Sequence, residues 1–142
     1  MQIRSAETAG FCFGVERAVS LAEQTAKSCA SAVTLGPIIH NRHVVERFEA
    51  MGLREIARAE DAQPGQTVVI RAHGIPVSEQ QTLAARGAKL VDATCPFVKK
   101  IHVIARQAEE AGRHLLIIGT PTHPEVTAIA SYSSDAHVFQ TA

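Results

Sequence analysis

Tryptophan is missing from this sequence of 142 residues, tyrosine occurs once, and aromatic residues make up only 4% of it. No apolar run approaches the roughly 20 residues that a membrane-spanning helix needs, and residues 1–5 turn polar too soon to begin a signal peptide. Fourteen basic residues balance fourteen acidic ones, so no overall field attracts nucleic acid or an anionic membrane. We therefore expect a cytoplasmic protein that binds neither nucleic acid nor membrane.

Cysteine is scarce and histidine is abundant. The three cysteines are odd in number and widely spaced, which argues against a disulfide framework and indicates reduced thiols: Cys12, Cys29 and Cys95. Three of the seven histidines lie beside Gly or Pro just after apolar runs: His40, His73 and His123. The placement of His43, His114 and His137 carries no signal that predicts a role.

Apolar runs alternate with segments of helical periodicity along the chain. We expect strands at 2–6, 32–35, 67–72, 90–92, 114–118 and 136–139, and helices at 15–28, 42–51, 77–86, 97–112 and 125–132. Residues 54–66 are polar and contain Pro-Gly, so we expect a surface connection there. This alternation is typical of βαβ units and predicts an α/β fold with parallel sheets.

One arrangement recurs: a strand, then a turn that holds Cys or His, then a helix. It occurs at Cys12, His40, His73, Cys95 and His123. Because the carboxyl ends of parallel strands share one edge of a sheet, we expect these five side chains to converge. Cys95 follows the apolar run that ends at Asp92 and precedes a helix, where the helix dipole stabilises an anion.

Two thiols and three imidazoles are compatible with several kinds of site. Thiolates select zinc, copper(I) or iron–sulfur clusters, but the sequence has no Cys-x-x-Cys pair, and Cys12 and Cys95 supply only two of the usual ligands. Histidines near helix amino ends suit a phosphate or diphosphate. Glu125, two residues after His123, is a candidate proton donor or base. Together these residues predict an anionic substrate beside a thiolate-bound centre.

Five short motifs occur in order and are similar to those of the 4-hydroxy-3-methylbut-2-enyl diphosphate reductase family, also called IspH or LytB. They are Ala-Gly-Phe-Cys-Phe-Gly-Val at 9–15, Ile-His-Asn at 39–41, Arg-Ala-His-Gly at 71–74, Asp-Ala-Thr-Cys-Pro at 92–96 and Thr-His-Pro-Glu-Val at 122–126. The chain resembles only the amino-terminal half of that family. The resemblance implies a pseudo-symmetric fold of three α/β units, with residues 1–95 as the first unit and 96–142 as part of the second.

The resemblance also implies roles for individual residues. Cys12 and Cys95 would be two of three cysteine ligands of a 4Fe-4S cluster, while His40, His73 and His123 would bind the diphosphate. Glu125 and His123 would serve catalysis, with Glu125 delivering protons as two electrons cleave the C–O bond. The products would be isopentenyl and dimethylallyl diphosphate, at the end of the methylerythritol phosphate route to isoprenoids.

The family's third cysteine has no counterpart in this sequence, because Cys29 lies near the end of a predicted helix and outside the converging turns. We therefore expect this chain to be inactive alone and to self-associate through uncovered apolar surface. An external donor such as ferredoxin or flavodoxin would supply electrons to the intact enzyme. Two alternatives remain open: a non-redox module that binds a diphosphate or nucleotide, and a thiol enzyme that uses Cys95 as its nucleophile.

Overall fold

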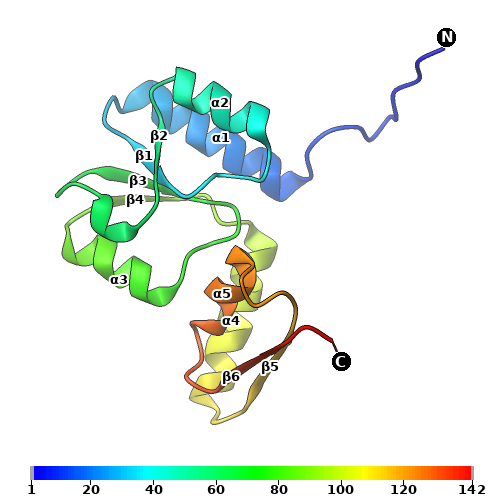
Figure 1. The fold of residues 1–142 in the computed structure, drawn as a ribbon, viewed down its shortest axis with the longest axis vertical. Helices are drawn as coiled ribbons and strands as arrows, with labels where there is room; N and C mark the ends of the chain where they lie inside the picture. The colour runs from blue at the N-terminus through cyan, green and yellow to red at the C-terminus, as the bar shows by residue number, and fades with distance from the viewer. Residues whose placement is uncertain (1, 142) are drawn as a thin grey trace.

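The computed structural model describes residues 2–141, which form two parallel sheets with helices packed against them (Figure 1). The first sheet has the order β2-β1-β3-β4, and the second pairs β5 with β6. The strands are β1 (Val33–Leu35), β2 (Arg54–Ile56), β3 (Thr67–Ile70), β4 (Lys89–Asp92), β5 (Leu115–Ile118) and β6 (Ala136–Phe139). The helices are α1 (Phe13–Ser28), α2 (Arg42–Ala50), α3 (Val77–Ala85), α4 (Pro96–Glu110) and α5 (Pro124–Ala130), with a 3₁₀ turn at Ala59–Asp61.

The four-stranded sheet is covered on both faces. Side chains alternate along β3, so that Val69 packs with α1 and α2, whereas Val68 and Ile70 pack on the other side with Leu83 of α3. In Figure 1 α1 and α2 lie on one side of this sheet and α3 on the other. Burial on both faces explains why β3 is a continuous apolar run, as is typical of parallel sheets.

The two-stranded sheet is covered on one face only. Leu115, Ile117, Ala136 and Val138 are partly buried, and α4 and α5 contact this part of the chain. The alternate positions face outward, and their exposed fractions are 67% for Leu116, 65% for Ile118 and 50% for Phe139. The β5–β6 sheet therefore presents an apolar outer face.

Two predicted elements are wrong. Residues 2–6 are not a strand: this segment is exposed, and Figure 1 shows the amino-terminal stretch extending away from the body. Its only large apolar side chain, Ile3, is 84% exposed, so burial supplies little reason for pairing with a sheet. Residues 54–66 are more than a connection, because Arg54–Ile56 forms edge strand β2 beside β1. The segment is short and mostly polar, so its sequence carries no strand pattern.

The remaining predicted strands and helices are confirmed to within a few residues, and all strand pairs are parallel. The four strands of the first sheet precede residue 96 and the two of the second follow it, while the division into domains at that point stays a prediction. Among the helices of residues 2–141, none is long and apolar enough to span a bilayer.

Candidate functional site

Three neighbouring strands of the first sheet end at one edge and deliver three of the predicted site residues. His40 follows β1, His73 follows β3 and Cys95 follows β4. Backbone hydrogen bonds connect these loops: Ala72 N–H donates to Ile38 O (3.1 Å), and Cys95 N–H donates to Ala72 O (2.9 Å). The loops therefore continue the order of the sheet beyond the ends of its strands.

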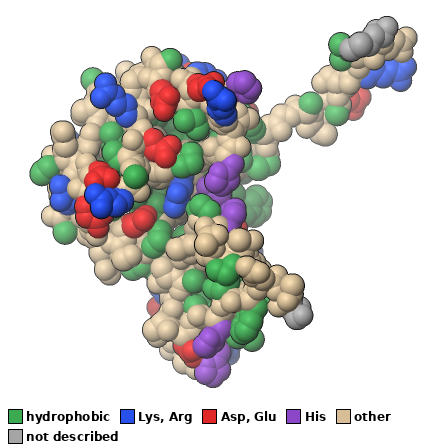
Figure 2. Space-filling view, viewed as in Figure 1, with side chains coloured by type: hydrophobic (Ala, Val, Ile, Leu, Met, Phe, Trp, Pro, Cys, Tyr) green, Lys and Arg blue, Asp and Glu red, His purple; other side chains and the backbone are tan. Residues whose placement is uncertain are grey.

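The other two residues reach the site by different routes, which corrects the expectation that one sheet edge carries all five. Cys12 follows an extended segment rather than a strand, and His123 follows β5 of the second sheet. The site therefore lies where the two parts of the molecule meet: the larger part, which contains the four-stranded sheet, and the smaller part, which contains the two-stranded sheet. Figure 2 shows histidine side chains gathered at the waist between these two parts.

The three predicted histidines form a triangle. Ring centroids are 4.4 Å apart for His40 and His73, 5.9 Å for His40 and His123, and 5.7 Å for His73 and His123. Three imidazoles at this spacing can direct several N–H groups at one small anion. The convergence predicted from the sequence is confirmed for these residues.

His73 is neutral at physiological pH. Partial burial, together with the smaller effects of the neighbouring His40, Arg71 and His123, lowers the pKa of this imidazole to about 4. Its Nδ1 is buried and has no hydrogen-bond partner among the described residues. A buried polar atom without a partner costs free energy, so a ligand that pairs with this side chain gains that energy back.

His123 caps α5, and its hydrogen bond defines the tautomer of the neutral ring. Its Nδ1 accepts the Glu125 N–H at 3.2 Å, so the proton lies on Nε2, which is free to donate. Glu125 occupies the first turn of α5 and lines the cavity described below. The start of α5 thus carries both an imidazole that can donate a proton and a carboxyl group.

Cys95 is the N-cap residue of α4, and its thiol lies against the first turn of α1. A Cβ at Gly14 would collide with Cys95 Sγ, so only glycine leaves room for the sulfur at this position. Arg17 of α1 donates to Thr94 O at 3.2 Å and to Asp92 O at 3.3 Å. These bonds hold α1, and with it the Cys12 loop, against the loop that carries Cys95.

Cys12 is the N-cap residue of α1 and is exposed, and both thiols are free. Together with the loops after β1 and β3, they line an open cavity of about 420 Å³, within the usual range for small-ligand sites. The lining residues are Phe11, Cys12, Val15, Ile39, His40, Asn41, Ala72, His73, Cys95, Val98 and Glu125. One cavity therefore combines both predicted thiols, two of the three histidines and the predicted carboxyl group.

Cys29 lies away from this cavity, as its sequence position predicts. Its sulfur is within 3.4 Å of the Thr67 hydroxyl at the start of β3. This contact and hydrogen bonds from Ser31 lower the pKa of the Cys29 thiol. Cys29 therefore cannot contribute to the site that contains Cys12 and Cys95.

A second cavity of about 190 Å³ is lined by residues of α3 and α4, of the ends of β3 and β4, and by Tyr132 after α5, and its charged groups already have partners. Lys99 pairs with Asp92 at 2.6 Å, and the Arg106 guanidinium stacks over the Tyr132 ring at 5.2 Å. The Lys99 contact also lowers the pKa of Asp92 against the opposing effect of its burial. The larger cavity is the better candidate for chemistry because it holds the thiols.

Sequence patterns did not reveal Arg17, which can position the Cys95 loop, or the cluster of His114, Asp135 and His137, which can bind a ligand. Arg17 gives no local signal, since its partners lie 75 and 77 residues away. His114, Asp135 and His137 come together at the start of β5 and β6, and no motif links them. Only the parallel pairing of the two strands brings these three side chains together.

The fold and site define an α/β protein with parallel sheets and a cavity of thiols and imidazoles at the carboxyl ends of its strands. Comparison with known proteins identifies the family. The LytB protein family model matches residues 3–142, and the chain belongs to the LytB family.

Curated relatives are named 4-hydroxy-3-methylbut-2-enyl diphosphate reductase. The protein of Oleidesulfovibrio alaskensis is 47% identical over 140 residues, covering 97% of this chain and 50% of the relative. The protein of Aquifex aeolicus is 44% identical over 128 residues, covering 89% and 44% respectively. The chain thus spans about half the length of the curated relatives it matches.

Two solved structures share the fold. One is described as (E)-4-hydroxy-3-methyl-but-2-enyl diphosphate reductase, the terminal enzyme of the non-mevalonate pathway; it has a TM-score of 0.81 and 42% identity, and the match covers 96% of this chain and 50% of that one. The reductase from Plasmodium falciparum has a TM-score of 0.88 and 28% identity, with 94% and 43% coverage. The parallel α/β fold is confirmed as about half of that architecture.

Proposed function

We propose that this chain is the substrate-binding, amino-terminal half of a reductase that removes the hydroxyl group of 4-hydroxy-3-methylbut-2-enyl diphosphate. The observation that carries the proposal is the single cavity of about 420 Å³ that holds two free thiols, His40, His73 and Glu125, with His123 beside it. A non-redox anion site needs the imidazoles and not the thiols. The curated relatives with this name support the proposal.

The histidine triangle would bind the diphosphate. The ring centroids of His40, His73 and His123 lie within 6 Å of one another, and Nδ1 of His73 has no hydrogen-bond partner among the described residues. An anion favours the protonated form of each imidazole, so binding would raise the pKa of His73 from its value of about 4. The amino end of α2, where Asn41 is the N-cap residue, would add its dipole to this attraction.

The donor set of the cavity fits part of an iron–sulfur cluster. Cysteine thiolates are the usual ligands of such clusters; Cys12 and Cys95 both cap helices at the cavity, and the bare Cα of Gly14 leaves space at one sulfur. A 4Fe-4S cluster held by these thiols would supply electrons to the bound substrate. A third thiol is needed, and Cys29 is committed elsewhere.

Residues at the start of α5 would deliver protons to the substrate. Breaking the C–O bond consumes two electrons and two protons, forms a C–H bond and releases the hydroxyl group as water. Glu125 lines the cavity, and its backbone N–H holds His123 with a proton on Nε2. We propose Glu125 as the proton donor and His123 as the group that orients the substrate hydroxyl and passes the proton on.

With two of three thiols present, we propose that these 142 residues do not turn over alone. A ferredoxin or flavodoxin would serve the whole enzyme as electron donor. The exposed side chains of Phe97, Ile101 and Ile104 on α4, with the outer face of β5–β6, would drive self-association of the chain. Sedimentation velocity over a range of concentrations tests this last point.

The test is anaerobic reconstitution with iron and sulfide, followed by iron analysis, visible and EPR spectra, and turnover with a strong chemical reductant. Cys12→Ser and Cys95→Ser should each abolish iron binding, whereas the matched control Cys29→Ser should retain it. Iron binding that is insensitive to Cys12 and Cys95 would refute the ligand assignment. Steady turnover by the wild-type chain would refute the claim that it is inactive alone.

The thiol-enzyme alternative makes a different prediction for alkylation. A cluster protects Cys12 and Cys95 together, so iodoacetamide should modify neither in the reconstituted protein and both in the metal-free protein. A nucleophile activated by a neighbouring base would instead leave Cys95 alone hyper-reactive in both samples.

A further inference from the structure

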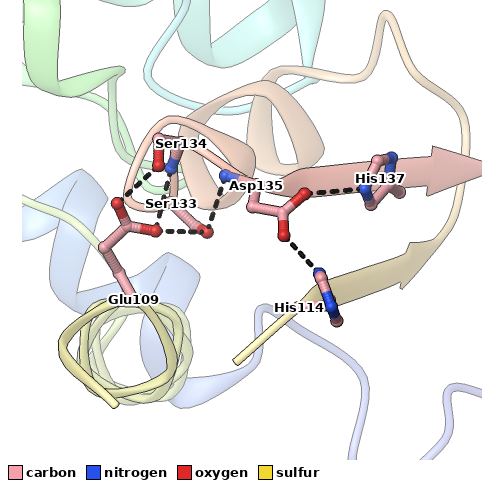
Figure 3. Close-up of polar contacts among 6 residues, drawn as sticks. All are labelled: Glu109, His114, Ser133, Ser134, Asp135 and His137. Carbon is pink, nitrogen blue, oxygen red and sulfur yellow. Dashed lines mark hydrogen bonds and ion pairs between the residues drawn. The ribbon is translucent and has the colours of Figure 1, made fainter. Parts of the chain in front are cut away.

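A second group of ligand-type side chains lies at the far end of the β5–β6 sheet, apart from the thiol cavity. Asp135 bridges two histidines: Oδ2 is hydrogen-bonded to His114 Nδ1, and Oδ1 lies 2.8 Å from His137 Nε2 (Figure 3). One ligand atom from each residue lies within 4.8 Å of the other two. In Figure 2 histidine side chains gather at this end of the smaller part as well.

Strand register holds the three side chains together. Leu116 pairs with His137, and Leu115 N–H donates to Asp135 O at 3.2 Å, so His114 enters β5 beside Asp135. Residues two apart along a strand point to the same face, which places Asp135 with His137 and His114 with Leu116. All three side chains therefore lie on the outer face of the sheet, beside its exposed apolar residues.

Separate contacts hold the loop that presents Asp135. Glu109 of α4 accepts hydrogen bonds from the Ser133 hydroxyl (2.9 Å), the Ser134 N–H (3.0 Å) and the Ser134 hydroxyl (2.6 Å) (Figure 3). Ser133 Oγ in turn accepts the Asp135 N–H at 3.3 Å. These bonds hold the backbone of Asp135 in place. Ligands in metal sites are likewise oriented by hydrogen bonds from neighbouring residues.

From this geometry we propose that His114, Asp135 and His137 form a site for a divalent transition-metal ion of the zinc type, distinct from the thiol cavity. Two imidazoles and one carboxylate select zinc, nickel, cobalt or copper(II) over magnesium and calcium, which prefer oxygen ligands throughout. The ion would replace the protons now shared between Asp135 and the two rings. Three protein ligands leave the remaining coordination positions to water.

A metal ion at this site would link β5 to β6 across the exposed outer face of the sheet. His114 stands at the start of β5, whereas Asp135 and His137 belong to the start of β6, so a bound ion cross-links two segments 21 residues apart. A ligand that binds only the folded state raises its stability by mass action. Metal binding therefore stabilises the smaller part of the molecule selectively.

The test is zinc titration by calorimetry on the Cys12→Ser/Cys95→Ser chain, in which both thiols of the larger cavity are absent. Zinc should bind with a one-to-one component that His137→Ala weakens at least tenfold, while magnesium shows no binding. His43→Ala is the matched control, because this exposed histidine lies on α2. His123→Ala separates the new site from the histidine triangle and should leave the component in place.

Paramagnetic cobalt(II) provides a second readout, which reports where on the chain the ion binds. Amide signals at the start of β5 and β6 should broaden in the parent and not in Asp135→Asn, whose side chain keeps its size. Unchanged circular dichroism shows that each variant is folded. Zinc affinity unaltered by His137→Ala, or broadening that persists in Asp135→Asn, would overturn the proposal and leave an ion-pair cluster only.

Discussion

In the four-stranded sheet helices cover both faces, whereas in the two-stranded sheet the outer face carries exposed Leu116, Ile118 and Phe139. The first sheet is stabilised by apolar burial on two sides. The second depends on packing against α4 and α5 and on polar contacts such as those of Glu109. The candidate active site lies between the two, so the larger part provides a rigid frame to which the smaller part brings His123 and Glu125.

This difference predicts that the largest change in the free energy of unfolding comes from a substitution in the core between the first sheet and α3. Leu83 of α3 is fully buried against β3, so Leu83→Ala should lower the free energy of unfolding by about 2–5 kcal/mol through lost burial and cavity formation. Urea denaturation followed by circular dichroism measures it. A loss under 1 kcal/mol would contradict the view that this core dominates stability.

The next effect is the dependence of stability on pH that His73 causes at the junction of the two parts. His73 has a pKa of about 4 in the folded protein against 6.5 unfolded, so between these values the unfolded state binds the additional proton. Stability should therefore fall as the pH drops from 6.5 to 4, by about 2 kcal/mol after allowance for solvent screening, and change no further from this group below pH 4.

The control for the pH effect is His73→Asn, which removes the titrating ring and should flatten the stability curve over this range. Pyrophosphate provides a second comparison. Because the anion favours protonated imidazoles, its affinity for the wild-type chain should rise as the pH falls from 7.5 to 6. An affinity for pyrophosphate that does not change with pH would contradict the assignment of the histidine triangle as its site.

An effect of similar size is expected where α1 meets the loop after β4. Arg17→Ala removes two hydrogen bonds to the carbonyl groups of Asp92 and Thr94, and should cost about 1.5–3 kcal/mol in total. It should also increase alkylation of Cys95 in the metal-free chain, since the loop loses its link to α1. The exposed variant Ser20→Ala, on the same helix, should change neither quantity.

A substitution in the smaller part should change stability only near the substituted residue. Glu109→Gln weakens the hydrogen bonds to Ser133 and Ser134, and should destabilise the loop that these bonds hold against α4. Hydrogen exchange should accelerate in β6 and the preceding loop and remain unchanged in β3. Faster exchange throughout the first sheet would show that the two parts unfold as one unit.

The smallest effect is expected on the outer face of the second sheet. Leu116→Thr should alter the free energy of unfolding by less than about 0.5 kcal/mol, because the side chain is mostly exposed and threonine suits a strand. The same change should reduce self-association of the chain. A stability loss comparable to that of Leu83→Ala would show that this face is covered in solution.

Much of the candidate site is predictable from the sequence, because local signals mark each of its turns. His73 lies in a Gly-containing turn after an apolar run, and Cys95 precedes Pro96 at a helix start. Residue type and position together therefore indicate that both residues lie at the carboxyl ends of strands. The strand at Arg54–Ile56 was missed because an exposed edge strand of three residues needs no apolar alternation. The strand predicted at residues 2–6 failed because strand propensity without a pairing partner does not hold a segment in a sheet.

The sequence by itself determined most of the order of strands and helices, the residues in each turn that holds a Cys or His of the site, and the family, because these depend on local periodicity, turn residues and spacing. Only the tertiary structure decided which sheet each turn extends, the burial that lowers the pKa of His73, and the meeting of His114 with Asp135 and His137. These properties depend on contacts between residues far apart in the chain. Register, desolvation and hydrogen bonding at such distances arise only when the helices and strands pack together.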